Sequence, residues 1–106
     1  MTLTRDFRET VAARVQAEPK FARALLDEAI TLFVNGEAET AKLVLRDLVN
    51  STIGFESLAE EIHKPAKSLH RMLSTSGNPT MSNLSAIFAA IKRSMNVDVR
   101  TRVVAA

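Results

Sequence analysis

Residues 55–74 decide the fold, and they read FESLAEEIHKPAKSLHRMLS. They hold two segments with helical spacing of apolar side chains, 55–62 and 66–74, separated by the proline-containing tripeptide 63–65. Each segment is too short to be a stable helix alone, so both must pack against neighbouring elements. The sequence therefore predicts a pair of short, packed helices.

The inner faces of this pair are marked by apolar residues. Leu58 and Ile62 face the core from the first segment, and Leu69 and Met72 meet them from the second. Ala59 is small at the position where the two helices must approach closely. This pattern is typical of a helix-turn-helix.

The second segment gathers its long polar side chains on one face. Lys67, His70, Arg71 and Ser74 follow the spacing i, i+3, i+4 and i+7, which places them on one side of a helix. A recognition helix needs such a face in the major groove, where Arg and Lys donate to guanine O6 and N7. An ordinary amphipathic surface helix has the same pattern, so this alternative stays open on this segment alone.

Charge is unevenly distributed along the chain. The net charge of +2 divides into −1 for residues 1–54 and +3 for residues 55–106. Between residues 62 and 97 there is no Asp or Glu. The basic residues there are Lys64, Lys67, Arg71, Lys92 and Arg93, together with both histidines. An acid-free basic segment indicates contact with a polyanion, although a solvated basic face without function is the alternative.

Three helices are expected within residues 4–51. The first covers residues 4–17, where Phe and Val recur every four positions. The second begins at Pro19, whose ring suits a first helical turn, and ends at Asn35-Gly36. The third follows and is closed by Gly54.

The C-terminal part is expected to hold one more helix and a tail. Residues 76–79 (SGNP) predict a turn, Thr80 is a suitable cap, and Asn96 ends the helix. The tail of residues 97–106 begins with apolar and polar residues in strict alternation, which predicts a strand with one buried face. No second strand is expected in this helical chain.

Composition and motifs exclude several classes of protein. The chain has 106 residues, 46% of them hydrophobic, which suits one globular domain rather than a disordered chain. It has no cysteine, and hence no disulfide or thiolate metal site. A Glu-x-x-His pair, Glu60 and His63, occurs only once, whereas di-iron bundles need two copies. With no catalytic triad, nucleophile elbow or phosphate-binding glycine loop, we expect no enzyme, no metal and no cofactor.

The expected location is the cytoplasm, without contact to a membrane. The longest apolar stretches are far shorter than the roughly 18–20 residues that a membrane span needs. The first eight residues mix charges with threonine and contain no apolar signal core.

Several strings in the sequence resemble a known family. They are LAEEI (58–62), KSLHRMLS (67–74) and GNPTMSNL (77–84), with ALLDEAI (24–30), GE (36–37) and LRDL (45–48) upstream. Over about residues 24–97 the chain resembles the lambda-repressor-like helix-turn-helix family and, more closely, the HigA-like addiction-module antidote proteins, which are antitoxins. The resemblance implies a five-helix DNA-binding fold, dimeric operator binding, autorepression and, in many members, capture of a ribonuclease toxin.

Two positions depart from the family pattern. The turn position that is usually Gly is His63, which can adopt a left-handed conformation at some cost. The first motif helix begins with Phe55, where many relatives place a DNA-contacting Gln.

These observations predict an all-α, five-to-six-helix, lambda-repressor-like domain over residues 1–106, with its motif at about 55–74 and a short extended tail at 97–106. The predicted function is sequence-specific repression by a homodimer on double-stranded DNA with a palindromic operator, as a transcriptional regulator or as the antitoxin of a toxin–antitoxin module. The alternative is a helical protein-interaction adaptor without specific DNA binding. The expected DNA contacts are Lys64, Ala66, Lys67, His70, Arg71, Ser74, Ser76, Asn78, Thr80 and Asn83.

The surface of the expected dimer has two candidates. The alternating tail has no partner strand in its own chain, so a second copy is its natural partner. If the tail is instead frayed, the apolar helix of residues 21–34 is the alternative surface.

Overall fold

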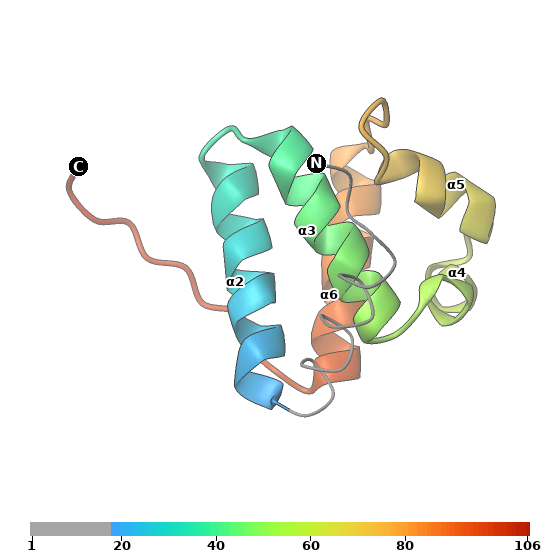
Figure 1. The fold of residues 1–106 in the computed structure, drawn as a ribbon, viewed down its shortest axis with the longest axis horizontal. Coiled ribbons are helices and arrows are strands. Elements are labelled where there is room, and N and C mark those ends of the chain that lie inside the picture. The colour runs from blue at the N-terminus through green and yellow to red at the C-terminus, as the bar shows by residue number, and fades with distance from the viewer. Residues whose placement is uncertain (1–17) are drawn as a thin grey trace.

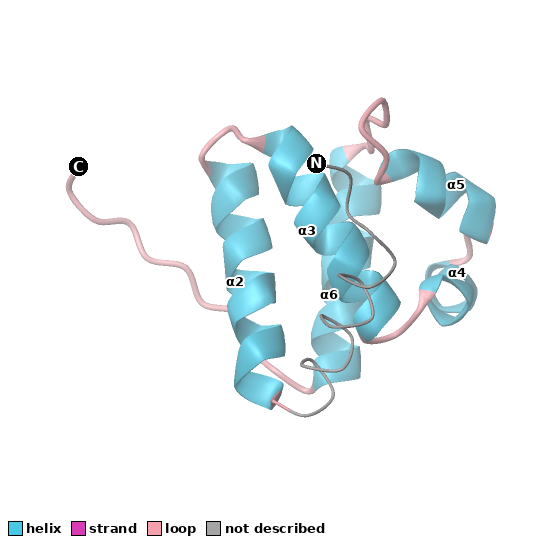
Figure 2. Cartoon of the chain, in the orientation of Figure 1, coloured by secondary structure: helices cyan, strands magenta, loops and turns pink. Residues whose placement is uncertain are grey.

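The computed structural model describes residues 18–106, which form five α-helices and no strand (Figures 1 and 2). The helices are α2 (Pro19–Val34), α3 (Ala38–Ser51), α4 (Phe55–Ile62), α5 (Ala66–Met72) and α6 (Met81–Met95). The all-helical class predicted from the sequence is confirmed. The helix expected over residues 4–17 lies outside the described residues. Of the helices in the described range, none combines the length and apolar character needed to cross a membrane.

Three of the helices end in the same way. Gly36, His63 and Asn96 follow α2, α4 and α6 with φ angles of 85°, 57° and 56°, in the left-handed region. In each case the next backbone N–H donates to a carbonyl five positions earlier, at 2.9, 3.1 and 3.2 Å. These bonds satisfy carbonyls that the helix leaves without partners. The stops predicted at Asn35-Gly36 and Asn96 are confirmed.

The core lies where the helices meet. α2 lies beside α3, and α4 packs against α5, α6 and α3. In Figure 1, α4 and α5 lie on the side of the bundle away from α2. The largest fully buried side chains are Leu45, Leu48, Val49, Leu58, Leu69, Leu73, Ile87 and Ile91. Each contributes about 1.5–3 kcal/mol of transfer free energy, so every helix except α2 anchors itself with at least one such residue.

α2 is joined to the bundle by one buried leucine, two buried alanines and several half-buried side chains. Ala22, Leu26 and Ala29 are its buried residues. Phe33 meets Phe88 of α6 edge to face, with ring centroids 5.7 Å apart and an interplanar angle of 87°. This is a favourable arrangement for two aromatic rings.

One predicted boundary is confirmed and one is corrected. α3 ends at Ser51, where the Thr52 hydroxyl donates to the Leu48 carbonyl at 2.6 Å. Gly54 N–H donates to the Val49 carbonyl at 2.7 Å, five positions earlier, so Gly54 closes α3 as predicted. Gly54, with φ 80°, also precedes α4 as its N-cap. α5 ends at Met72 rather than Ser74, because the Ser74 hydroxyl turns back to the Arg71 carbonyl at 2.7 Å.

The strand predicted for the tail is also corrected. Residues 97–106 follow an irregular course drawn as a loop in Figure 2, and Val103 is 99% exposed. A strand with one buried face needs a neighbour that accepts its backbone hydrogen bonds. The described residues of one copy provide no such neighbour.

Candidate nucleic-acid interface

The inner faces of α4 and α5 are arranged as the sequence predicts. Leu58 and Leu69 are fully buried, whereas Ile62, Met72 and Ala59 are half-buried and pack against the core. These contacts fix α5 on the bundle, although it is only seven residues long. The orientation of its outer face therefore follows from the packing of its inner face.

The outer face of α5 carries three exposed side chains. Lys67, His70 and Arg71 all point away from the core, as predicted, while Leu69 between them is fully buried. Lys64, just before the helix, is exposed as well, and Ala66 is half-buried at the first position. The structure thus brings three basic side chains together on and beside one short helix.

His70 is exposed but is fixed in place by a ring contact. Its imidazole stacks on the Phe55 ring, with centroids 3.9 Å apart and an interplanar angle of 21°. Phe55 is buried at the start of α4, so the stack ties the beginning of the first motif helix to the middle of the second. Phe55 departs from the pattern of the family that the sequence resembles, and its contact with His70 was not predicted from the sequence.

The turn between α4 and α5 is left-handed although the residue there is histidine and not glycine. His63 lies at φ 57° and ψ 45°, the left-handed region expected for this position. Lys64 N–H then donates to the Ala59 carbonyl at 3.1 Å, and Pro65 enters α5 in an extended conformation. His63 therefore adopts the left-handed conformation that glycine adopts at a lower energetic cost.

The predicted contact residues after α5 do not continue its helical face. Because α5 ends at Met72, Ser74 lies beyond the face that Lys67 and Arg71 share. Its hydroxyl caps the Arg71 carbonyl and lies 3.4 Å from the Ser76 hydroxyl. Ser76 and Asn78 are exposed in the loop that follows.

Thr80 and Asn83 form the cap of α6. The Thr80 hydroxyl oxygen accepts a hydrogen bond from the Asn83 backbone N–H at 3.1 Å. This confirms the capping role predicted for Thr80. Thr80 is exposed and Asn83 half-buried.

Lys42 of α3 supports the loop behind α5, a role that was not predicted from the sequence. Lys42 is only 6% exposed, and its Nζ donates to the carbonyl of Gly77 at 2.6 Å and of Thr75 at 3.3 Å. A buried ammonium needs such acceptors, because burial without them is costly. The signal was its position three residues before Leu45 and seven before Val49, on the buried side of α3.

Gly77 completes this support. A Cβ at this position would overlap the backbone carbonyl oxygens of Arg71 and Met72, which are the last turn of α5. The loop can therefore press against the end of α5 only because this residue has no side chain. Lys42 and Gly77 together set where the helix ends.

The basic residues of α6 have a different environment from those of α5. Arg93 Nε donates to Glu61 Oε1 of α4 at 2.8 Å, and Lys92 Nζ lies 3.7 Å from Asp98 Oδ1. Lys64, Lys67 and Arg71 have no ion pair within the described part of the chain. Within the acid-free stretch, the basic residues around α5 therefore have no acidic partner among the described residues, whereas the two on α6 each have one.

The described residues contain no group of three or more metal-ligating side chains. In comparisons with protein-family models, with curated proteins and with solved structures, the chain has no significant match.

Proposed function

We propose that the protein is a sequence-specific DNA-binding transcriptional regulator that inserts α5 into the major groove. The observation that carries this proposal is the exposed face of α5, where Lys67, His70 and Arg71 lie together without an acidic partner among the described residues. A helix held by its apolar side and basic on its outer side has the two properties that a recognition helix needs.

The proposed roles follow from side-chain chemistry. Arg71 donates in the plane of its guanidinium, which matches guanine O6 and N7, so we assign base reading to it. Lys64 and Lys67 are point charges suited to phosphate oxygens. His70 is held in place by its stack on Phe55 and presents its ring edge at the same surface.

The flanking residues would position the duplex. Ser76, Asn78 and Thr80 are exposed on the loop before α6 and could approach the backbone beside the groove. Contacts of this kind fix the register of a protein on DNA without reading its sequence.

A single recognition helix of this length reads only a few base pairs, so we propose that the regulator binds as a two-fold dimer and represses transcription from an inverted repeat. Its half-sites would lie about 34 Å apart, or a multiple of that distance, along one face of the duplex.

The experiment is a selection of binding sites from a random pool of duplexes. We expect enrichment of an inverted repeat that the protein binds at least about 1,000-fold more tightly than a scrambled duplex. Affinity for both duplexes should fall with salt, because binding at phosphates releases counterions, at about 0.9 in logarithmic slope per neutralised phosphate. Fluorescence anisotropy from low to moderate salt measures both effects.

An adaptor that binds an acidic protein through the same basic face is the alternative. It also predicts salt-sensitive binding to DNA, but with equal affinity for selected and scrambled duplexes. A pool without enrichment after repeated rounds would therefore contradict the proposed function and favour the adaptor.

A further inference from the structure

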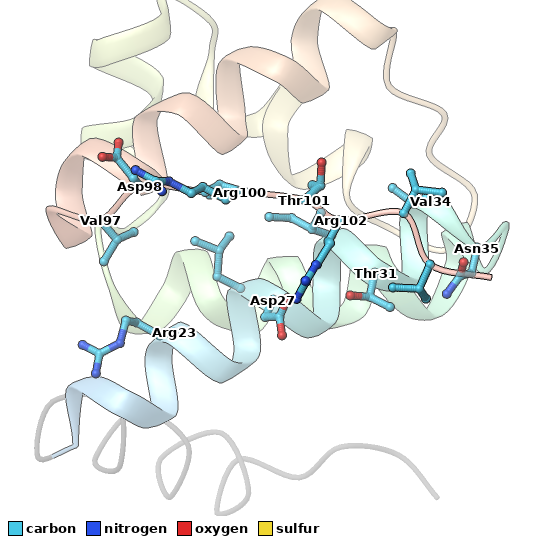
Figure 3. A pocket seen from close by; sticks show the side chains of 15 residues that line it. Arg23, Asp27, Thr31, Val34, Asn35, Val97, Asp98, Arg100, Thr101 and Arg102 are labelled. Carbon is cyan, nitrogen blue, oxygen red and sulfur yellow. The ribbon is translucent and has the colours of Figure 1, made fainter. Parts of the chain in front are cut away.

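The second surface of interest is a groove on the side of the molecule away from α5. One wall is the outer face of α2 and the other is the C-terminal arm, which we define as residues 97–104 (Figure 3). The groove has a volume of about 740 Å³, and Leu26, Ile30 and Val34 contribute apolar side chains from α2.

Exposed apolar side chains concentrate at this groove. Six large hydrophobic residues are exposed in the described chain, and four of them line it, namely Val34, Val99, Val103 and Val104. Val34 and Val104 are 75% and 74% exposed, so the groove is unfilled in a single copy. Exposed apolar side chains gathered on one face in this way make the groove a candidate interaction site.

The backbone of the arm is also free to pair. Beyond the Val97 N–H, which donates to the Lys92 carbonyl, its amides and carbonyls have no backbone partner within the described residues. A segment whose backbone groups are open in this way can pair with a second strand.

We propose that the occupant of the groove is the arm of a second copy, paired antiparallel with this one in the register that places Arg100 opposite Arg100 of its partner. In this register residue i faces residue 200 − i. Val97 then faces Val103, and Asp98 faces Arg102, each pair occurring twice by symmetry.

The charges of the arm favour this register over the one centred on Thr101. Shifting the pairing so that Thr101 faces itself keeps valines together, Val99 with Val103, but sets Arg100 against Arg102 twice. Like charges directly opposite are destabilising, and opposite charges are stabilising. The proposed register has two attractive Asp98–Arg102 pairs against one Arg100–Arg100 pair. Centring the pairing on Val99 would set Asp98 opposite Arg100 twice, but Asn96 caps α6 in the left-handed conformation, so that ladder would hold only residues 97–101 instead of 97–103.

The two arms would then lie over the exposed faces of both α2 helices and cover Ile30 and Val34. This inference does not depend on the proposed function, since pairing of the arms requires no DNA.

Cysteine cross-linking tests the register, because the natural chain has no cysteine. In R100C the two sulfur-bearing residues would face each other with Cα atoms about 4.5–5.5 Å apart, within reach of a disulfide. In R102C the same residues would be offset by four positions, about 13 Å along the strands, which is too far. Because R102C also removes the attractive Asp98–Arg102 pairs, V103C is a second control that keeps every charge and would be offset by six positions, about 20 Å along the strands.

We expect mild oxidation without DNA to convert R100C to covalent dimer and to leave R102C at least tenfold less cross-linked. Equal cross-linking of the two variants, or preferential cross-linking of T101C or V99C, would overturn the register. A full-length chain that remains monomeric at every attainable concentration in sedimentation equilibrium would overturn the interface itself.

Charge reversal gives a second readout. D98R and R102D should each raise the dissociation constant of the dimer by roughly tenfold, because two attractive pairs become repulsive. The double variant D98R/R102D should return to within about threefold of the natural chain, because the pairs are exchanged rather than lost. Absence of rescue would contradict the proposed pairs.

The site selection described above is measured separately. Arms that pair in a chain that selects no duplex would refute the proposed function alone. A chain that selects a duplex while its arms do not cross-link would refute this inference alone.

Discussion

Both ends of the acid-free stretch are basic in sequence, but among the described residues only the basic side chains of α6 have ion-pair partners. Around α5, Lys64, Lys67 and Arg71 are exposed and have no ion pair within the described residues. On α6, Arg93 is paired with Glu61 and Lys92 with Asp98. Both acidic partners lie in the second half of the chain, immediately outside the stretch at either end. Within one acid-free run, the fold therefore leaves the basic residues around α5 available to an anionic ligand and pairs those of α6 with acidic side chains.

We expect the largest effect from a substitution that moves the end of α5, because it would disturb the helix that carries the unpaired basic side chains. In Gly77→Ala the added Cβ meets backbone carbonyl oxygens, which cannot move as a flexible side chain can. We expect a loss of about 3 kcal/mol in the free energy of unfolding. Urea denaturation measures it, with Ser76→Ala in the same loop as the control at under about 0.5 kcal/mol. Equal midpoints for the two variants would show that the loop is not pressed against α5.

The comparison becomes sharper when one arginine is removed from each end. Arg71→Ala should weaken binding to a selected duplex by about 1–3 kcal/mol if Arg71 reads a base. Arg93→Ala removes the same charge but from an existing ion pair, so its effect should stay below about 0.5 kcal/mol. Titration against selected and scrambled duplexes measures both, since loss of base reading lowers affinity only for the selected one. Equal losses for the two variants would contradict the distinction between the two ends.

His63 allows a backbone role to be separated from a contact role at the edge of the α5 cluster. Glycine at this left-handed position relieves backbone strain but gains freedom in the unfolded chain. His63→Gly should therefore raise the free energy of unfolding by about 0.5 kcal/mol and leave DNA affinity unchanged. Thermal melting and anisotropy check the two parts. A marked loss of affinity in this stabilised variant would show that the imidazole itself contacts the ligand.

The smallest effect is expected from making α6 resemble α5. Glu61→Gln removes the negative charge paired with Arg93 without a large change of shape and keeps an amide oxygen that accepts its hydrogen bond, so one cation loses its counter-charge. The pair is largely exposed, so we expect the free energy of unfolding to fall by no more than about 0.5 kcal/mol. A loss above about 2 kcal/mol in a denaturant titration would show that the ion pair is a main support of the α4–α6 contact.

Local patterns predicted the elements of the motif well. The bounds of α4, the start of α5, the Thr80 cap and the left-handed His63 all depend on residues within one or two helical turns. Such features follow from spacing and from the conformational preferences of single residues. The exposure of Lys67 and Arg71 followed in the same way from the burial of Leu69.

The missed features depend on contacts between distant residues. The hydrogen bond from Lys42 to Gly77 spans 35 positions, and the one from Arg93 to Glu61 spans 32. No periodicity within one helix reports which carbonyl or carboxylate will lie beside it after folding. The strand predicted for the tail was wrong for a related reason. Alternation predicts a strand, but a strand also requires a partner.

The buried ammonium of Lys42 has a consequence for how the segment proposed to bind DNA could be reused. A peptide excised from α4 to the start of α6 would retain every side chain proposed to touch the duplex, yet lose the donor that fixes its connecting loop from α3. The segment from α4 to the start of α6 therefore lacks one of the side chains that position it. Grafting its specificity onto another scaffold would require a donor in place of Lys42, and a library that randomises α5 should leave Lys42 and Gly77 untouched.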